Sequence, residues 1–145
     1  MNYDTRSSVA EDCVSNRIES DGCFVCGTGN PIGLKLTFRM EGDVCRSEFT
    51  SRDEHAGYPG VTHGGIVFSL LDDVMANWLW LQDIQGMTAK AEVRYRGELP
   101  IGVPVRLEGR CVSRRGRLAQ MHGQIIREDD GLVVAEATAS FMTRG

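Results

Sequence analysis

The chain has 145 residues, of which 41% are hydrophobic and 25% are charged, and its formal net charge is −4. This size and composition suit one domain with one core, and they argue against a disordered or fibrous protein. An acidic chain does not favour nucleic acid as a partner. No apolar run is long enough to span a membrane, and the first residues lack the pattern of a signal peptide. We therefore expect a cytoplasmic protein without nucleic-acid or membrane partners.

The five cysteines are odd in number and scattered, and without a secretory signal they do not predict a disulfide framework. Cys23 and Cys26 form a CxxC motif, which supplies two of the four ligands of a structural zinc site. Three other residues complete such a site only if the fold brings them near: Cys13, Cys45 and His55. We interpret Cys23 and Cys26 as reduced structural cysteines and predict no metal. A small zinc or redox module is the open alternative.

Residues 1–22 are polar and lack a clear period, and they form a separate N-terminal arm, with a short helix as one option. Residues 23–145 form the domain. After a turn-rich segment, apolar residues alternate with polar ones over 34–40 and again over 45–49, which predicts two half-buried strands.

The longest apolar stretch, residues 66–81, is too long for a typical strand and has few polar interruptions, so it predicts a buried helix. Four further strands are predicted at residues 89–95, 103–109, 119–125 and 133–141, with hairpin turns at 114–117 and 129–131. The fold class that satisfies both patterns is α+β, with one long central helix wrapped by a curled antiparallel sheet of about five to six strands. Three small residues on the last strand would let the helix approach closely: Ala135, Ala137 and Ala139.

Two motifs carry a resemblance to a known family. The segment 60–65 contains His63-Gly64-Gly65, and an acidic residue, Asp72, follows nine positions after the histidine. With the CFVCG motif at residues 23–27, these residues resemble the hotdog-fold acyl-CoA thioesterase superfamily, in its phenylacetyl-CoA thioesterase-like branch. The resemblance covers about residues 23–142. It implies a hotdog fold, a homodimer or a homotetramer built as a dimer of dimers, and hydrolysis of an acyl-CoA to free acid and coenzyme A.

The predicted catalytic residues are Asp72, Gly64, Gly65, His63 and Thr88. Amides at a helix start lack internal partners and favour negative charge, so the glycines predict an oxyanion hole. The resemblance implies that Gly64 donates and that Thr88 positions the water. Asp72 acts either as general base or as nucleophile. Because it lies about 10 Å along the helix from Gly65, the two cannot meet on one carbonyl within one chain, and the resemblance implies a site across a dimer interface.

Coenzyme A carries phosphates, and it is part of the substrate, so no separate cofactor is expected. A basic cluster at the 114–117 turn predicts the phosphate contacts: Arg114, Arg115, Gly116 and Arg117. Arg94 and Arg96 are alternative contacts. Candidates for the acyl pocket, which are equally candidates for core or dimer contacts, are Phe68, Met75, Trp78 and Trp80.

Two positions depart from the family pattern. Gly57 stands where many relatives carry asparagine, with His55 as a conceivable substitute, and Gly97-Glu98 replaces the usual Arg-Pro. Two alternative functions use the same pocket: an acyl-CoA-binding protein without catalysis, and a hotdog hydratase or dehydratase acting on acyl thioesters. The acyl group and the choice between coenzyme A and acyl carrier protein stay open.

Overall fold

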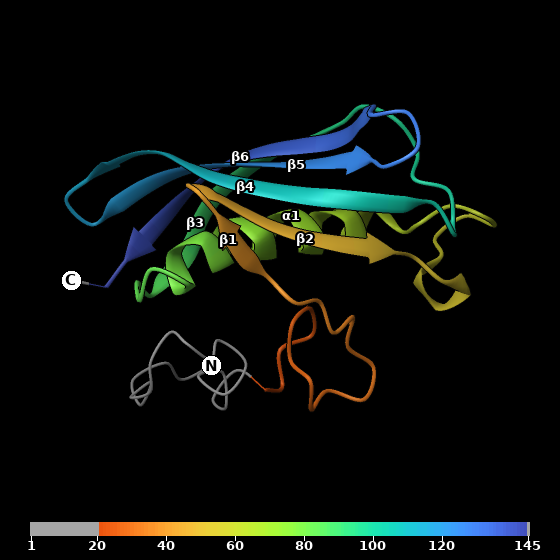
Figure 1. Ribbon diagram of the computed structural model, residues 1–145, viewed down its shortest axis with the longest axis horizontal. Coiled ribbons are helices and arrows are strands. Elements are labelled where there is room, and N and C mark those ends of the chain that lie inside the picture. The colour runs from red at the N-terminus through yellow and green to blue at the C-terminus, as the bar shows by residue number, and fades with distance from the viewer. Residues whose placement is uncertain (1–20, 145) are drawn as a thin grey trace.

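The computed structural model describes residues 21–144, so the predicted N-terminal arm lies almost entirely outside the described residues. The secondary structure consists of one α-helix, a short 3-10 turn and six strands within this range (Figure 1): β1 (Arg39–Glu41), β2 (Val44–Thr50), η3 (Asp53–His55), α1 (Gly64–Trp80), β3 (Gly86–Tyr95), β4 (Pro104–Arg115), β5 (Leu118–Arg127) and β6 (Val133–Thr143).

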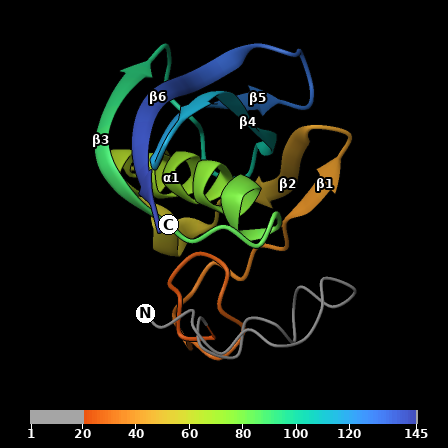
Figure 2. The same cartoon turned by 90° about the vertical axis from the view of Figure 1, so that its left-hand side faces the viewer.

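The six strands form one antiparallel sheet in the order β1-β2-β4-β5-β6-β3. Figure 2 shows the sheet arching over α1, with β3 at one edge and β1 at the other. The predicted helix wrapped by a curled antiparallel sheet is therefore confirmed. The open edge of β3 matters for the site, because the helix start lies near the end of this strand.

The core lies between α1 and the concave face of the sheet. Leu70, Leu71, Val74 and Met75 are fully buried on the helix. Helix and sheet approach closely at Gly109 on β4, where an added Cβ would lie 2.5 Å from the carbonyl oxygen of Val74. The sequence assigned the close approach to three alanines of β6, and these alanines are buried.

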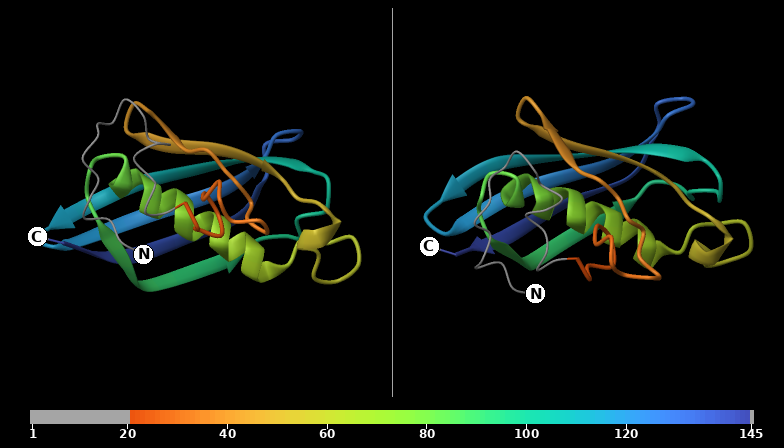
Figure 3. Two further views of the ribbon diagram at one scale, coloured as in Figure 1. Left: turned by 90° about the horizontal axis from the view of Figure 1, so that it is seen from below. Right: turned by 60° about the horizontal axis from the view of Figure 1, so that its bottom comes forward.

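The predicted strand over residues 34–40 is largely wrong, because only residues 39–41 pair with the sheet as β1. The amides of Leu34 and Leu36 donate instead to the carbonyls of Phe24 and Val25, at 2.8 and 2.9 Å. The alternation still predicted burial correctly, since Leu36 and Phe38 join the core. Figure 3 shows the segment 21–38 running along α1 on the side away from the sheet, which is the side that the sheet leaves uncovered.

A β-bulge interrupts β3 between Thr88 and Lys90, where the register with β6 shifts. An extra residue in a strand reverses which side chains face the core. The plain alternation predicted Ala89 on the inner face, but Ala89 is exposed and Thr88 is half-buried. The bulge therefore directs the Thr88 side chain toward the helix.

Candidate functional site

The turn that enters α1 leaves one backbone donor without an acceptor. His63 is the N-cap, and its Nδ1 accepts a hydrogen bond from the Gly65 amide at 2.8 Å. Its carbonyl accepts from the amides of Ile66 and Val67. Among the first four amides of the helix, only that of Gly64 has no acceptor within the described residues, and it lies in the field of the helix dipole. The turn can thus stabilise a negatively charged oxygen.

Neighbouring strands and loops hold this turn in place. The Tyr95 hydroxyl donates to the Gly64 carbonyl at 2.9 Å, and the His63 amide donates to the His55 carbonyl at 2.8 Å. An open hollow lies beside the turn. It is lined by residues of the loop before α1, of α1 itself and of the end of β3, including Tyr58, Val67 and Tyr95. Tyr95 was not among the predicted site residues, because only its position at the end of β3 brings its hydroxyl to Gly64.

Asp72 lies two turns further along α1 and is paired with Thr88. The Thr88 hydroxyl donates to the Asp72 carboxylate at 2.6 Å. Burial raises the pKa of Asp72 above its ordinary value, and the hydrogen bond from Thr88 partly opposes this effect. Phe68 precedes Asp72 by one helical turn and therefore shares its face. The fold thus brings together Asp72 and Thr88, two of the predicted site residues.

Within one chain, Gly64 and Asp72 stay apart. Asp72 follows Gly64 by eight positions, which corresponds to about 12 Å along the helix axis. Both lie on the same continuous helix, so no local rearrangement short of breaking α1 can bring them together.

His55 does not replace the asparagine of the family pattern. Its ring is 7% exposed, and its Nδ1 accepts from the Arg52 amide at 2.9 Å, so it serves the fold of the loop. Burial, followed by the charge of Arg52, lowers the pKa of His55. At Gly57, an added Cβ would lie 3.1 Å from the His63 Cα, so this loop is already filled where the asparagine would stand.

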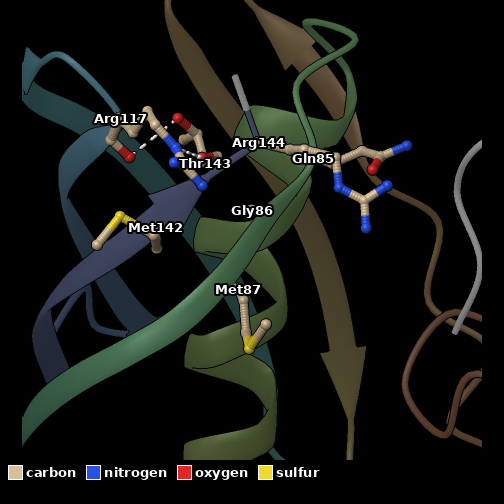
Figure 4. Close-up of a pocket in the computed structure, with 7 residues that line it drawn as sticks. All are labelled: Gln85, Gly86, Met87, Arg117, Met142, Thr143 and Arg144. Carbon is tan, nitrogen blue, oxygen red and sulfur yellow. Dashed lines mark hydrogen bonds between the residues drawn. The ribbon is translucent and has the colours of Figure 1, made fainter.

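The predicted phosphate-binding arginines lie on the β4–β5 hairpin, beyond the C-terminal end of α1 rather than beside the glycine turn of the same chain (Figure 1). The hairpin turn is confirmed, with Gly116 at a φ of 60°. Arg117 lines a pocket with Gln85, Met87 and Arg144 (Figure 4), and its Nε donates to the Thr143 carbonyl at 3.2 Å. Arg114 and Arg115 are exposed but do not line this pocket.

The two alternative arginines, Arg94 on β3 and Arg96 just after its end, differ. Arg94 is exposed, whereas Arg96 is bound in an ion pair with Glu136. Of the aromatic and apolar pocket candidates, Met75 and Trp80 are buried in the core, and Trp78 donates to the Asp43 carbonyl at 2.8 Å. Phe68 is the candidate that shares the face of Asp72.

The two cysteines of the CxxC motif lie beside Asp73. Their sulfurs and an Asp73 carboxylate oxygen all lie within 4.8 Å of one another. Neither Cys45 nor His55 completes this group, because Cys45 is fully buried in the core and His55 is held by Arg52. Cys13 lies outside the described residues. Asp73 was not among the predicted ligands, because tertiary structure alone brings it to the cysteines.

A single long helix wrapped by a curled antiparallel sheet is the hotdog fold. The chain belongs to the thioesterase superfamily, whose family model matches residues 59–134, slightly more than half of the chain.

Known proteins agree with this assignment. The chain is 31% identical over 86 residues to Acyl-coenzyme A thioesterase THEM4 of Xenopus laevis, covering 59% of this chain and 39% of that protein. A solved thioesterase superfamily protein is 28% identical with a TM-score of 0.79, covering 84% of this chain and 60% of that one. The chain thus spans less than two thirds of either relative.

A hypothetical thioesterase of Streptococcus pneumoniae TIGR4, solved with coenzyme A, has the same fold, with a TM-score of 0.71 and 20% identity over 76% of this chain and 89% of that one. Within residues 21–144, no helix has the length and apolar character needed to cross a membrane.

Proposed function

We propose that this protein hydrolyses an acyl-CoA thioester in a site formed between two copies of the chain. The observation that carries the proposal is the pair of separated half-sites. The Gly64 amide is without an acceptor among the described residues, and Asp72 with Thr88 is half-buried about 12 Å away along α1. Membership of the thioesterase superfamily supports the same chemistry.

The open edge of β3 supports a particular dimer. Thr88, near the start of β3, contacts Asp72, and Tyr95, at its end, contacts Gly64. If two β3 strands pair antiparallel about an axis through Glu92, the bulge between Thr88 and Lys90 sets Thr88 of one chain opposite Tyr95 of the other. This pairing would bring the carboxylate of one chain close to the glycine turn of its partner, twice by symmetry.

In such a site, the roles follow from the donors and acceptors present. The thioester oxygen accepts from the Gly64 amide, and Asp72, oriented by Thr88, takes a proton from a water that attacks the thioester carbon. When the tetrahedral intermediate collapses, the carbon–sulfur bond breaks, and the departing coenzyme A sulfur takes up the proton from Asp72. Direct attack by Asp72, giving an anhydride that water then opens, is the alternative for the first step.

The same pairing supports a role for the hairpin arginines. It would set Met87 of one chain opposite Arg96 of the other, so the pocket with Arg117 and Arg144 would border the partner's glycine turn. Guanidinium groups bind phosphates strongly, and two of them at one end of the joined cleft suit the phosphates of coenzyme A. Arg144 was not among the predicted contacts.

The test measures hydrolysis of a panel of aryl, short-chain and medium-chain acyl-CoA thioesters by the wild type and by Asp72→Asn. The release of the free thiol of coenzyme A reports the rate. General base catalysis contributes about 10²–10⁴-fold, so we expect a loss of that size in kcat. Asp83→Asn is the matched control, because Asp83 lies in the loop after α1 at a φ of 63°, which asparagine adopts readily.

Equal rates for the wild type and Asp72→Asn would contradict the proposal, and tight acyl-CoA binding without turnover would favour the non-hydrolytic binding protein. Hydration of a 2-enoyl-CoA would favour the hydratase. Sedimentation analysis checks the assembly, and a fully active monomer would exclude a site shared between chains.

A further inference from the structure

The proposed hydrolysis makes no use of the group formed by Cys23, Cys26 and Asp73. The Cys23 sulfur lies 4.0 Å from Asp73 Oδ1, and the three ligand atoms are mutually within 4.8 Å. Asp73 follows Asp72 by one position on α1, so its side chain points about 100° away from the catalytic face. The group therefore belongs to a different side of the helix.

The CxxCG turn is built around the Cys23 sulfur. The Cys26 amide donates to this sulfur at 3.5 Å, and the Gly27 amide closes the turn on the Cys23 carbonyl at 2.9 Å. A Cβ at Gly27 would lie 2.1 Å from the Asp21 carbonyl oxygen, so the turn requires glycine. Backbone amides directed at a sulfur stabilise its thiolate form, which is the form that ligates metals.

A hydrogen bond from the Asn77 side chain orients the Asp73 carboxylate. The Asn77 side-chain amide donates to Asp73 Oδ2 at 3.0 Å and to the Asp73 carbonyl at 2.9 Å. Asn77 is 3% exposed, so this donor is rigidly placed. A buried hydrogen-bond donor behind a carboxylate is the arrangement that orients ligands in metal sites.

We propose that Cys23, Cys26 and Asp73 bind one divalent zinc-class cation. Two thiolates favour zinc over magnesium or calcium, and a carboxylate oxygen is an accepted third ligand. In a tetrahedral site with bonds of about 2.3 Å, neighbouring sulfurs lie about 3.8 Å apart. The two sulfurs, which lie within 4.8 Å of each other, exceed that distance by about 1 Å at most. Water or another small ligand supplies the fourth position.

Such a cation would fasten the segment 21–38 to α1. This segment covers the helix on the side away from the sheet, and it contributes Val25, Leu36 and Phe38 to the core (Figure 3). Two ligands come from the segment and one from the helix, so the ion crosslinks them directly. Metal binding to a folded site adds its binding free energy to the stability of the fold.

The test uses the full chain, reduced, loaded with Zn²⁺ and freed of excess metal by dialysis. We expect about one zinc per chain in the wild type by elemental analysis and less than about a tenth of that in Cys23→Ser/Cys26→Ser. Cys111→Ser is the matched control, because Cys111 lies on β4, away from the group, and it should retain the metal. Asp73→Asn should release zinc to a competing chelator at a lower chelator concentration than the wild type.

Cobalt gives a second readout that does not depend on the variants. The Co²⁺-loaded wild type should show thiolate-to-metal absorption in the near ultraviolet and strong visible bands of a tetrahedral site. Zinc should also protect two thiols of the wild type from a thiol reagent. The proposal would be overturned if the double variant retained as much zinc as the wild type. It would also be overturned if the wild-type protein, with its thiols reduced, bound no zinc and showed no thiolate band with cobalt. Asp72→Asn should keep its zinc, so the result stands apart from that of the hydrolysis test.

Discussion

The Thr88 hydroxyl donates a hydrogen bond of 2.6 Å to the carboxylate of Asp72, although 16 positions separate the two residues in the chain. The bulge in β3 makes this contact possible, because it turns Thr88 toward the helix. A hydrogen bond to a charged group contributes about 1.5–3 kcal/mol. If it orients the catalytic carboxylate, Thr88→Val should lower kcat about tenfold or more. Thr88→Ser, which keeps the hydroxyl, should recover most of the rate, and equal loss in both variants would contradict this role.

Gly64→Ala separates catalysis from folding. The atoms nearest to a Cβ at this position belong to the Tyr95 side chain, at 3.8 Å, which is an ordinary contact, so the helix should form normally. Alanine also suits a helix better than glycine, by about 0.5–1 kcal/mol in its interior. We expect unchanged or slightly higher thermal stability together with a clear loss of kcat/KM, because the methyl group obstructs the carbonyl that approaches the amide. Full activity would exclude Gly64 as the oxyanion donor.

Arg117→Gln tests the phosphate contact. We expect KM for acyl-CoA to rise several-fold, because a charged hydrogen bond to phosphate is lost. Hydrolysis of the matching acyl-pantetheine thioester, which lacks the nucleotide, should change little. Arg39→Gln is the control of equal charge, since Arg39 lies on the edge strand β1 and does not line the pocket of Arg117. An equal change for both substrates would place Arg117 outside the nucleotide site.

Gly109→Ala should destabilise the fold strongly. The added Cβ would lie 2.5 Å from the Val74 carbonyl oxygen, so either α1 or β4 must move. Overpacking typically costs about 1–3 kcal/mol, and a clash with backbone belongs at or above the upper end. Denaturant unfolding measures this change. Gly97→Ala, where no atom lies within 4 Å of the added Cβ, should leave the free energy of unfolding nearly unchanged.

His55 should make stability fall in mild acid. Its burial lowers its pKa below the ordinary value of 6.5, so the folded state binds the proton less readily than the unfolded state. The stabilising contribution is complete above pH 6.5 and is lost as the pH falls below that value. Between pH 7.5 and pH 5.5, the Tm of the wild type should drop more than that of His55→Asn, which can still accept from the Arg52 amide. Parallel curves would contradict the assignment.

The sequence by itself determined the elements whose periodicity was strong. The apolar run at 66–81 predicted α1, and regular alternation predicted β2, β3, β4, β5 and β6, because burial on one face leaves a direct mark on residue order. The alternation did not predict that β3 pairs with β6 instead of β4. The same alternation failed at residues 34–40. There the apolar side chains are buried, but their backbone bonds to Phe24 and Val25 instead of a neighbouring strand, and the pattern of side chains carries no record of backbone partners.

Only the tertiary structure decided which polar groups meet. His63, Gly64 and Asp72 could be singled out in sequence because one helix sets their spacing. The contacts of Tyr95 with Gly64, of Thr88 with Asp72 and of Asp73 with the two cysteines join segments far apart in the chain. A bulge, a sheet register and the packing of the segment 21–38 on α1 create these contacts, and each is a property of the folded backbone in three dimensions rather than of local residue order.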